Sequence, residues 1–310
     1  MSESPILVTG GAGFIGSHLV DGLLAQGYAV RVLDNLSMGK LGNLPLDNPR
    51  LSFIEGDVAD PAVVDAAVAG CQAVAHLAAV ASVQASVEDP ISTHRSNFVG
   101  TQNLCESMRR HGVKRVIFSS SAAVYGQNGE GSAIHEDTPK SPLTPYAIDK
   151  LGSEYLLQFY AREHALEPAI FRFFNVFGPR QDPSSPYSGV ISIFIERARK
   201  GLPITVFGDG EQTRDFIYVA DLVKVLRQAL TADTVQEGAV NVGLGRSTSL
   251  NVLLECIGDL CGGLPEVSRA APRSGDIRHS LADNRRLLER FDLGEPTALR
   301  DGLRALLESC

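Results

Sequence analysis

The sequence predicts an α/β fold with a doubly wound parallel sheet, followed by a smaller mixed α/β domain. Two observations carry this prediction. Short apolar segments alternate with helical stretches through the first half of the chain, and this alternation weakens after about Asn175. The 310 residues are 44% hydrophobic and 21% charged, a composition typical of a globular chain with a full core.

Six short apolar segments are predicted to form the strands of the main sheet. Because a helical stretch separates most of these segments from the next, neighbouring strands are expected to run parallel, with helices on both faces of the sheet. The segments are 6–8, 29–33, 51–54, 73–76, 115–119 and 169–173.

Local residue patterns mark the ends of the helices. Asp60 and Thr144 each precede a proline, an arrangement in which the first side chain caps a helix and proline takes its first position. Glycine also follows three periodic apolar segments, where a left-handed residue would end a helix; these glycines are Gly27, Gly112 and Gly201.

Two domains are predicted, with a boundary at residue 175. The first covers 1–175 and receives a returning segment near 215–245, in which 240–242 is expected to join the main sheet. The second, 176–310, is interleaved with the first. Its helices and strands are predicted over 190–200, 205–207, 219–232, 250–261, 284–291 and 297–308.

The composition argues against several functional classes. With 28 Lys+Arg against 36 Asp+Glu, the net charge of −8 argues against nucleic-acid or membrane-surface binding, which needs a basic face. The first strand begins too close to Met1 for a secretion signal, so a cytoplasmic location is expected. The five cysteines and seven histidines lack metal-ligand spacing, so no metal is expected and the thiols are expected to be reduced.

A glycine-rich turn, Gly10-x-x-Gly13-x-x-Gly16, directly follows the first apolar segment. Glycines at this spacing let a pyrophosphate approach the backbone, and the next helix directs its N-terminal amides at the phosphates. The turn therefore predicts a dinucleotide-binding domain of the Rossmann type. Asp34, at the end of the second segment, would accept hydrogen bonds from a ribose and repel a 2′-phosphate, which favours NAD over NADP.

Residues after the third and fourth segments add to this site. Asp57 is positioned to meet the adenine edge, and Ala78 and Ala79 are small enough for the backbone to pass close to the cofactor. A solvated turn aspartate and a packed alanine pair are the alternative interpretations.

Tyr146 and Lys150 are four residues apart at the start of a predicted helix, so they share one face. The ammonium, a nicotinamide ring and the helix N-terminus are expected to lower the pKa of the phenol and make it a base. Ser121 follows the fifth apolar segment at the carboxyl edge of the sheet and would pass a proton between substrate and Tyr146. The alternative is a serine that caps backbone amides, an interpretation that also suits Ser119 or Ser120.

Nearly the whole chain resembles the extended short-chain dehydrogenases/reductases, and specifically the UDP-hexose 4-epimerases. The resemblance lies in the motifs above and in five further segments that match in order and spacing, at 34–37, 119–126, 172–180, 208–216 and 273–276.

The resemblance implies an NAD site and a UDP-sugar site. By this resemblance the catalytic residues would be Tyr146, Lys150 and Ser121. NAD would contact Tyr146 and Lys150 together with Gly10, Gly13, Phe14, Ile15, Gly16, Asp34, Asn35, Ser37, Gly39, Lys40, Asp57, Val58, Leu77, Ala78, Ala79, Asn97, Ser119 and Phe173. The UDP-sugar would contact Ser121, Tyr146, Ser82, Val83, Asn175, Val190, Thr205, Phe207, Arg214, Arg273, Asp276 and Ser280.

Two positions narrow the reaction implied by the resemblance. Relatives that dehydrate or decarboxylate nucleotide sugars carry an acid just after the serine run, where this chain has Ala122 and Ala123. A small residue at the position of Ser280 admits an N-acetyl group in this family. The prediction is an NAD-dependent UDP-N-acetylhexosamine 4-epimerase. The alternatives are a UDP-glucose/UDP-galactose 4-epimerase and a non-catalytic NAD-binding regulator. The apolar stripes of the predicted helices 91–111 and 146–164 resemble the family's dimer contact, so a homodimer is expected.

Overall fold

The computed structural model describes residues 4–128, 131–182, 189–272 and 277–309. The chain forms two compact units, each built from three stretches of sequence. The first unit comprises Met1–Val124, Pro142–Arg172 and Val223–Ala239; the second comprises Tyr125–Ser141, Phe173–Leu222 and Val240–Cys310.

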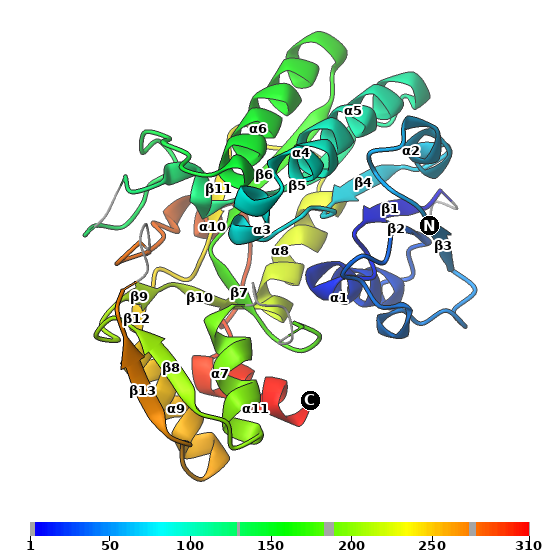
Figure 1. The fold of residues 1–310 in the computed structure, drawn as a ribbon. Coiled ribbons are helices and arrows are strands. Elements are labelled where there is room, and N and C mark those ends of the chain that lie inside the picture. The colour runs from blue at the N-terminus through cyan, green and yellow to red at the C-terminus, as the bar shows by residue number, and fades with distance from the viewer. Residues whose placement is uncertain (1–3, 129–130, 183–188, 273–276, 310) are drawn as a thin grey trace. The chain divides into compact units, whose positions relative to one another are not determined.

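The sheet of the first unit contains six strands in the order β6-β5-β4-β1-β2-β3 (Figure 1). β1 lies between β2 and β4 and pairs in parallel with both, so that Val8 is in register with Val32 and Ala75. Strand order therefore reverses at β1, and ligands of open α/β sheets bind at such a reversal. The strands are β1 (Ile6–Thr9), β2 (Val30–Asp34), β3 (Leu51–Glu55), β4 (Ala73–His76), β5 (Arg115–Ser121) and β6 (Glu167–Phe173).

Helices cover both faces of this sheet, which confirms the predicted Rossmann-type fold. Figure 1 shows α2, α5 and α6 on one face, where Val64, Leu104 and Leu157 join the main hydrophobic core. On the other face, Arg227 of α8 donates a hydrogen bond to the carbonyl of Gly22 in α1 (3.5 Å). The helices are α1 (Phe14–Ala25), α2 (Pro61–Val68), α3 (Val83–Glu88), α4 (Pro90–His94), α5 (Gly100–His111), α6 (Pro145–His164) and α8 (Val219–Thr231).

The predicted helix boundaries follow from local hydrogen bonds. Asp60 caps α2 by accepting from the amides of Ala62 and Val63, and Thr144 caps α6 by accepting from Ala147. The predicted helix over 91–111 is present as one uninterrupted helical stretch, Pro90–His111, in which the turn Arg95–Val99 between α4 and α5 is π-helical. The predicted stop glycines have left-handed backbone angles, with φ of 86° at Gly27, 69° at Gly112 and 64° at Gly201.

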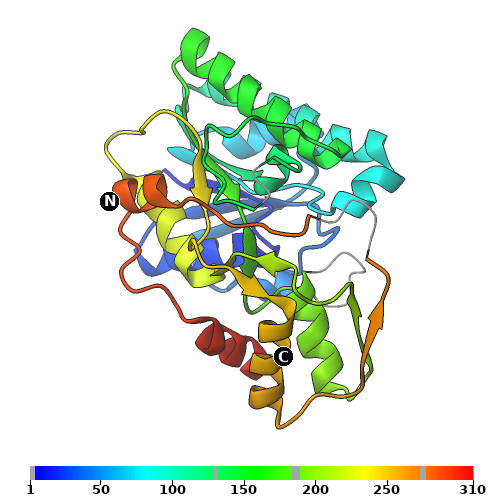
Figure 2. The same ribbon diagram turned by 90° about the vertical axis from the view of Figure 1, so that its left-hand side faces the viewer.

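The second unit combines short strand pairs with helices around its own core. β7 (Asn175–Phe177) pairs in parallel with β10 (Phe216–Tyr218), and Figure 2 shows β8 (Ile204–Phe207) alongside β13 (Val267–Ala270). β9 (Thr213–Arg214) pairs antiparallel with β12 (Thr248–Ser249). The remaining elements are β11 (Val240–Val242), α7 (Val190–Arg199), α9 (Leu250–Cys261), α10 (Arg285–Arg290) and α11 (Leu299–Glu308).

Across the described part of the chain, none of the helices combines the length and apolar character that crossing a membrane requires.

Candidate active site

The glycine-rich turn joins β1 to α1 in a conformation that only glycine fits. Gly10 has φ +69°, and a Cβ at this position would lie 2.8 Å from the amide nitrogen of Ala78. A Cβ at Gly16 would collide with the carbonyl oxygen of Gly10. Helix α1 begins at Phe14 with no side-chain cap, so the first-turn amides, including that of Ile15, are available to an anion. These residues fit a pyrophosphate.

The predicted ribose ligand, Asp34, also holds the turn together. Its carboxylate oxygens accept hydrogen bonds from the amides of Ala12 (2.9 Å) and Leu36 (2.8 Å). A Cβ at Gly39 would lie 2.8 Å from Asp34 Oδ1, so the following loop passes against the carboxylate. The same loop contains the other predicted cofactor residues of this region, Asn35, Ser37 and Lys40.

After β3 and β4, backbone hydrogen bonds involve the predicted residues. Asp57 Oδ1 accepts from the amide of Ala59 (2.9 Å), as expected for a turn aspartate. The amide of Leu77 donates to the carbonyl of Thr9 (3.2 Å). Asn97 contacts both backbone groups of Val80, accepting from its amide (2.8 Å) and donating to its carbonyl (3.2 Å). Val58 is buried after β3, and Ala79 follows Ala78 in the loop after β4.

The predicted catalytic residues meet at the carboxyl end of β5. Ser121 is the last residue of β5, and its oxygen accepts from the amide of Ala123 (3.2 Å). Its hydroxyl group is therefore free to donate to the phenol of Tyr146, in the first turn of α6, with which it is hydrogen-bonded. This bond lowers the pKa of Tyr146, but burial raises the pKa by more. The predicted lowered phenol pKa is thus wrong for the protein's own groups, because desolvation of the phenolate dominates.

Lys150 lies one turn after Tyr146 and is almost completely buried. Its Nζ atom is 4.9 Å from the ring centroid of Phe118 and 5.9 Å from that of Tyr146. Burial lowers the pKa of Lys150 to about 7, while the negative charges of Asp149 and Glu154 partly oppose that shift. Lys150 can therefore both hold and release a proton near neutral pH.

The two serines before Ser121 do not cap backbone amides, in contrast to the alternative interpretation. Ser119 donates to the carbonyl of His76 (3.1 Å), and Ser120 donates to Glu154. Arg172 binds both carboxylate oxygens of Glu154 at 2.9 and 2.6 Å, which forms a buried ion pair. Sequence reasoning missed Glu154, although it lies on the same helical face as Tyr146 and Lys150, at a spacing of four residues.

In the second unit, Thr213 links two predicted substrate residues. Arg214 donates to the carbonyl of Thr213 (2.9 Å), and the amide of Ser280 donates to the same carbonyl (3.2 Å). Asn175 in β7 donates to the carbonyl of Asp215 (3.3 Å).

The other predicted residues of this unit lie in several elements. Thr205 and Phe207 lie on the same face of β8, Phe173 ends β6, and Val190 begins α7. Arg273 and Asp276 lie outside the described residues.

Asp215 organises this region and was missed by sequence reasoning. Its buried carboxylate accepts from the amides of Leu244 (2.8 Å), Gly245 (2.9 Å) and Ala282 (3.0 Å). Burial raises the pKa of Asp215, and these hydrogen bonds oppose the shift. One carboxylate thereby fixes two loops of the second unit.

Ser82 and Val83 begin α3. Ser82 accepts from the amide of Ala85 (2.9 Å) and so caps the helix. Val83 is exposed.

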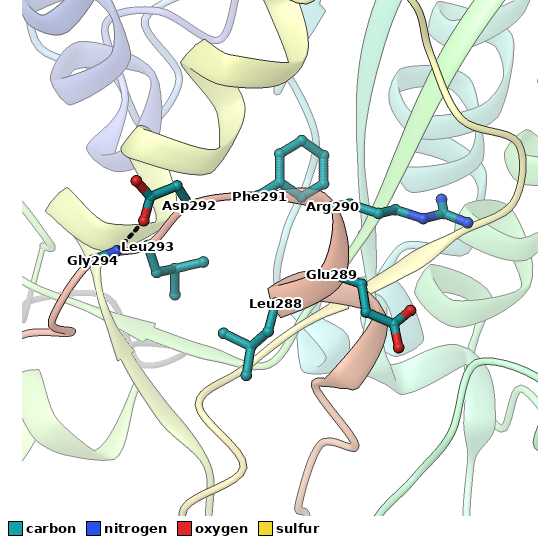
Figure 3. A pocket seen from close by; sticks show the side chains of 7 residues that line it. All are labelled: Leu288, Glu289, Arg290, Phe291, Asp292, Leu293 and Gly294. Carbon is teal, nitrogen blue, oxygen red and sulfur yellow. Dashed lines mark hydrogen bonds between the residues drawn. The ribbon is translucent and has the colours of Figure 1, made fainter.

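A hollow in the second unit is lined by residues from the end of α10 onward (Figure 3). Asp292 accepts from the amide of Gly294 (2.8 Å) at its edge. The lining residues are Leu288, Glu289, Arg290, Phe291, Asp292, Leu293 and Gly294, and none of them is a predicted site residue. The hollow is therefore not the candidate active site.

Comparisons with known proteins agree with this geometry. A putative UDP-glucose 4-epimerase of Methanocaldococcus jannaschii is 40% identical over 280 residues, which cover 90% of this chain and 89% of that protein. The solved structure of UDP-N-acetylglucosamine 4-epimerase from Methanobrevibacter ruminantium, in complex with UDP-N-acetylmuramic acid, is 38% identical with a TM-score of 0.93. That match covers 100% of this chain and 98% of the solved one.

A second solved structure bears on the cofactor. The UDP-glucose 4-epimerase of Thermus thermophilus, in complex with NAD, is 37% identical with a TM-score of 0.89, covering 98% of both chains. The model of the NAD dependent epimerase/dehydratase family matches residues 6–243. The predicted NAD cofactor and the resemblance to extended short-chain epimerases are confirmed. The chain belongs to the NAD dependent epimerase/dehydratase family.

Proposed function

We propose that this enzyme interconverts UDP-N-acetylhexosamines by inverting carbon 4 of the sugar, with NAD as cofactor. The observation that carries the proposal is the hydrogen-bonded pair of Ser121 and Tyr146, with Lys150 buried one helical turn away. The coarser function, a UDP-sugar 4-epimerase, rests on the names of the relatives and on the family match.

The proposed proton transfer uses residues of the first unit. Tyr146, directly or through Ser121, takes the proton of the sugar 4-hydroxyl as the 4-keto sugar forms. It returns the proton once the keto sugar has rotated in the site and received the hydride on its other face. When bound, NAD supplies the acceptor and donor of the hydride. Lys150, with a pKa of about 7, supplies positive charge beside the phenol when protonated.

Two features support the proposed choice of sugar, and a third supports the proposed reaction. Ser280 is small, which leaves room for an N-acetyl group. Ala122 and Ala123 provide no acid for removal of water, which argues against a dehydratase. The similar enzyme of Methanobrevibacter ruminantium is a UDP-N-acetylglucosamine 4-epimerase. In this proposal the UDP group contacts Asn175, Arg214, Thr205, Phe207, Arg273 and Asp276.

Assays with four UDP-sugars test this proposal. UDP-N-acetylglucosamine and UDP-N-acetylgalactosamine should turn over with the higher kcat/KM, compared with UDP-glucose and UDP-galactose. Equal or better turnover of the plain hexoses would favour the UDP-glucose 4-epimerase alternative, which the names of several relatives also support. Absence of turnover with all four sugars would favour the regulatory alternative.

An isotope experiment tests the hydride cycle. Because the hydride that leaves carbon 4 returns to the same carbon, substrate deuterated there should keep its label in the product. Loss of the deuterium to solvent would contradict the proposed chemistry.

A homodimer is proposed from the exposed side of the first unit's helices. Ile91 is 81% exposed on α4, and further large apolar side chains are exposed on α3 and α6. Isolated surface apolar residues are common, but several on adjacent helices are typical of an interface. They are Val83, Val87, Ile91, Ile148, Tyr155 and Phe159. Light scattering should give twice the chain mass, and Ile91→Lys with Phe159→Lys should give the single-chain mass.

A further inference from the structure

His76 ends β4 and is completely buried, and both of its ring nitrogens are hydrogen-bonded. Nδ1 lies 2.7 Å from the hydroxyl oxygen of Thr9, in β1, and Nε2 lies 3.1 Å from that of Thr101, in α5. Three elements of the first unit therefore meet at one imidazole. Neither the proton transfer nor the predicted cofactor contacts make use of it.

The neighbouring hydrogen bonds fix the proton on this ring. The hydroxyl of Thr101 donates to the carbonyl of Asn97 (2.6 Å), so its oxygen must accept from His76. Nε2 therefore carries the hydrogen, and Nδ1 accepts from the hydroxyl of Thr9. The oxygen of Thr9 in turn accepts from the amide of Ala78 (3.2 Å).

This chain of hydrogen bonds closes on itself. It begins at the amide of Ala78 and ends at Asn97, whose side chain holds both backbone groups of Val80. We call these bonds the His76 network; they enclose the loop 77–80 after β4. The backbone of this loop passes close to Gly10, since a Cβ at Gly10 would lie 2.8 Å from the amide nitrogen of Ala78.

The His76 network persists because the imidazole remains neutral. Burial and the nearby ammonium of Lys150 lower the pKa of His76 to about 3. A second ring proton would turn Nδ1 from acceptor into donor and break the bond from Thr9.

We infer that His76 is a positioning residue for the cofactor: its Nε2–H form holds the loop 77–80 in the place where NAD contacts the backbone of Leu77, Ala78 and Ala79. The inference rests on the cofactor contacts assigned above. It does not depend on which sugar the enzyme accepts.

Variants of Thr101 test this role with little change of shape. Thr101→Val removes the hydroxyl that links His76 to Asn97 and keeps the volume, while Thr101→Ser restores the hydroxyl. Ser107→Ala is the matched control, because Ser107 is equally buried in α5 but donates to Asp65, which is not part of the His76 network. His76→Phe keeps a ring next to Phe118 without either nitrogen.

The measurements are the rate at which the purified enzyme loses bound NAD and the melting temperature of each variant. Thr101→Val and His76→Phe are expected to lose NAD about tenfold faster than the wild type, the effect of about one lost buried hydrogen bond. Thr101→Ser and Ser107→Ala should stay near the wild-type rate. If His76→Phe does not fold, the Thr101 pair still decides the question.

Equal rates of NAD loss from Thr101→Val and Ser107→Ala, at similar melting temperatures, would overturn the inference. The His76 network would then be a purely structural feature. A wild type that retains NAD but converts none of the four UDP-sugars would refute the proposed function. It would not affect the comparison of NAD rates.

Discussion

The hydroxyl of Ser121, at the end of β5, is hydrogen-bonded to the phenol of Tyr146, in the first turn of α6. Burial raises the pKa of the phenol and the bond from Ser121 lowers it, so the Ser121 hydroxyl favours the phenolate that would accept the proton of the sugar. Tyr146→Phe is therefore expected to lower kcat for UDP-sugars about 10²- to 10⁴-fold, the usual contribution of a positioned base.

Tyr155→Phe is the control for this substitution. Tyr155 lies on the same helix, and Tyr155→Phe keeps the ring that the proposed dimer contact would use, so removal of its hydroxyl should leave kcat unchanged. A fully active Tyr146→Phe enzyme would discredit the assignment of the base.

Gly16→Ala should reduce NAD binding and stability, because the new Cβ would collide with the carbonyl of Gly10. Overpacking of this kind costs about 1–3 kcal/mol of unfolding free energy. Gly42→Ala is the control, since no atom lies within 4 Å of its Cβ position, and should change stability by less than about 0.5 kcal/mol. Retention of NAD per chain and denaturant unfolding measure both effects, and equal behaviour of the two variants would contradict the prediction.

The buried pair of Arg172 and Glu154 makes a strong stability prediction. Arg172→Met leaves the carboxylate of Glu154 buried without its cation and should cost about 3–5 kcal/mol of unfolding free energy. Adding Glu154→Met should recover part of this loss, because no unpaired charge then remains.

A surface ion pair gives the comparison. Arg300→Met breaks the exposed pair with Asp259 (3.0 Å) and should cost less than about 1 kcal/mol. Urea denaturation of all three variants would rank these losses in unfolding free energy. A double variant less stable than Arg172→Met would argue against unpaired charge as the cause.

Lys150 predicts a dependence of stability on pH. Its pKa falls from 10.5 to about 7 on folding, so between these values the unfolded chain binds the proton that the folded chain has lost. Stability therefore rises with pH in this window. From pH 7 to 9 the wild type should gain about 2 kcal/mol relative to Lys150→Met. Denaturation curves at several pH values measure this difference, and a constant difference would mean that the amine keeps its proton.

The first unit was largely predictable because its signals are local. The apolar segments, the capping residues Asp60 and Thr144, and the glycine turn depend on neighbours in sequence, and the structure reproduces them. The spacing of Tyr146 and Lys150 is equally local. It therefore predicted the shared helical face correctly.

What the sequence could not predict depends on partners far along the chain. The bonds from Ser120 to Glu154 and from the carboxylate of Asp215 to three amides connect distant segments. The pKa of Tyr146 depends on how deeply folding buries it, which no local pattern gives. The π-helical turn at Arg95–Val99 also adds a residue to a helix without a recognisable composition.

Because the chain contributes alternately to its two units, neither unit can complete its folding early in synthesis. The first unit requires Val223–Ala239, and the second requires both Tyr125–Ser141 and the stretch that begins at Val240. The glycine turn leaves the ribosome early, but the unit that contains it is complete only when residue 239 has been made. Neither unit can be released as a contiguous fragment, so proteolytic cuts in the middle of the chain should inactivate both units together.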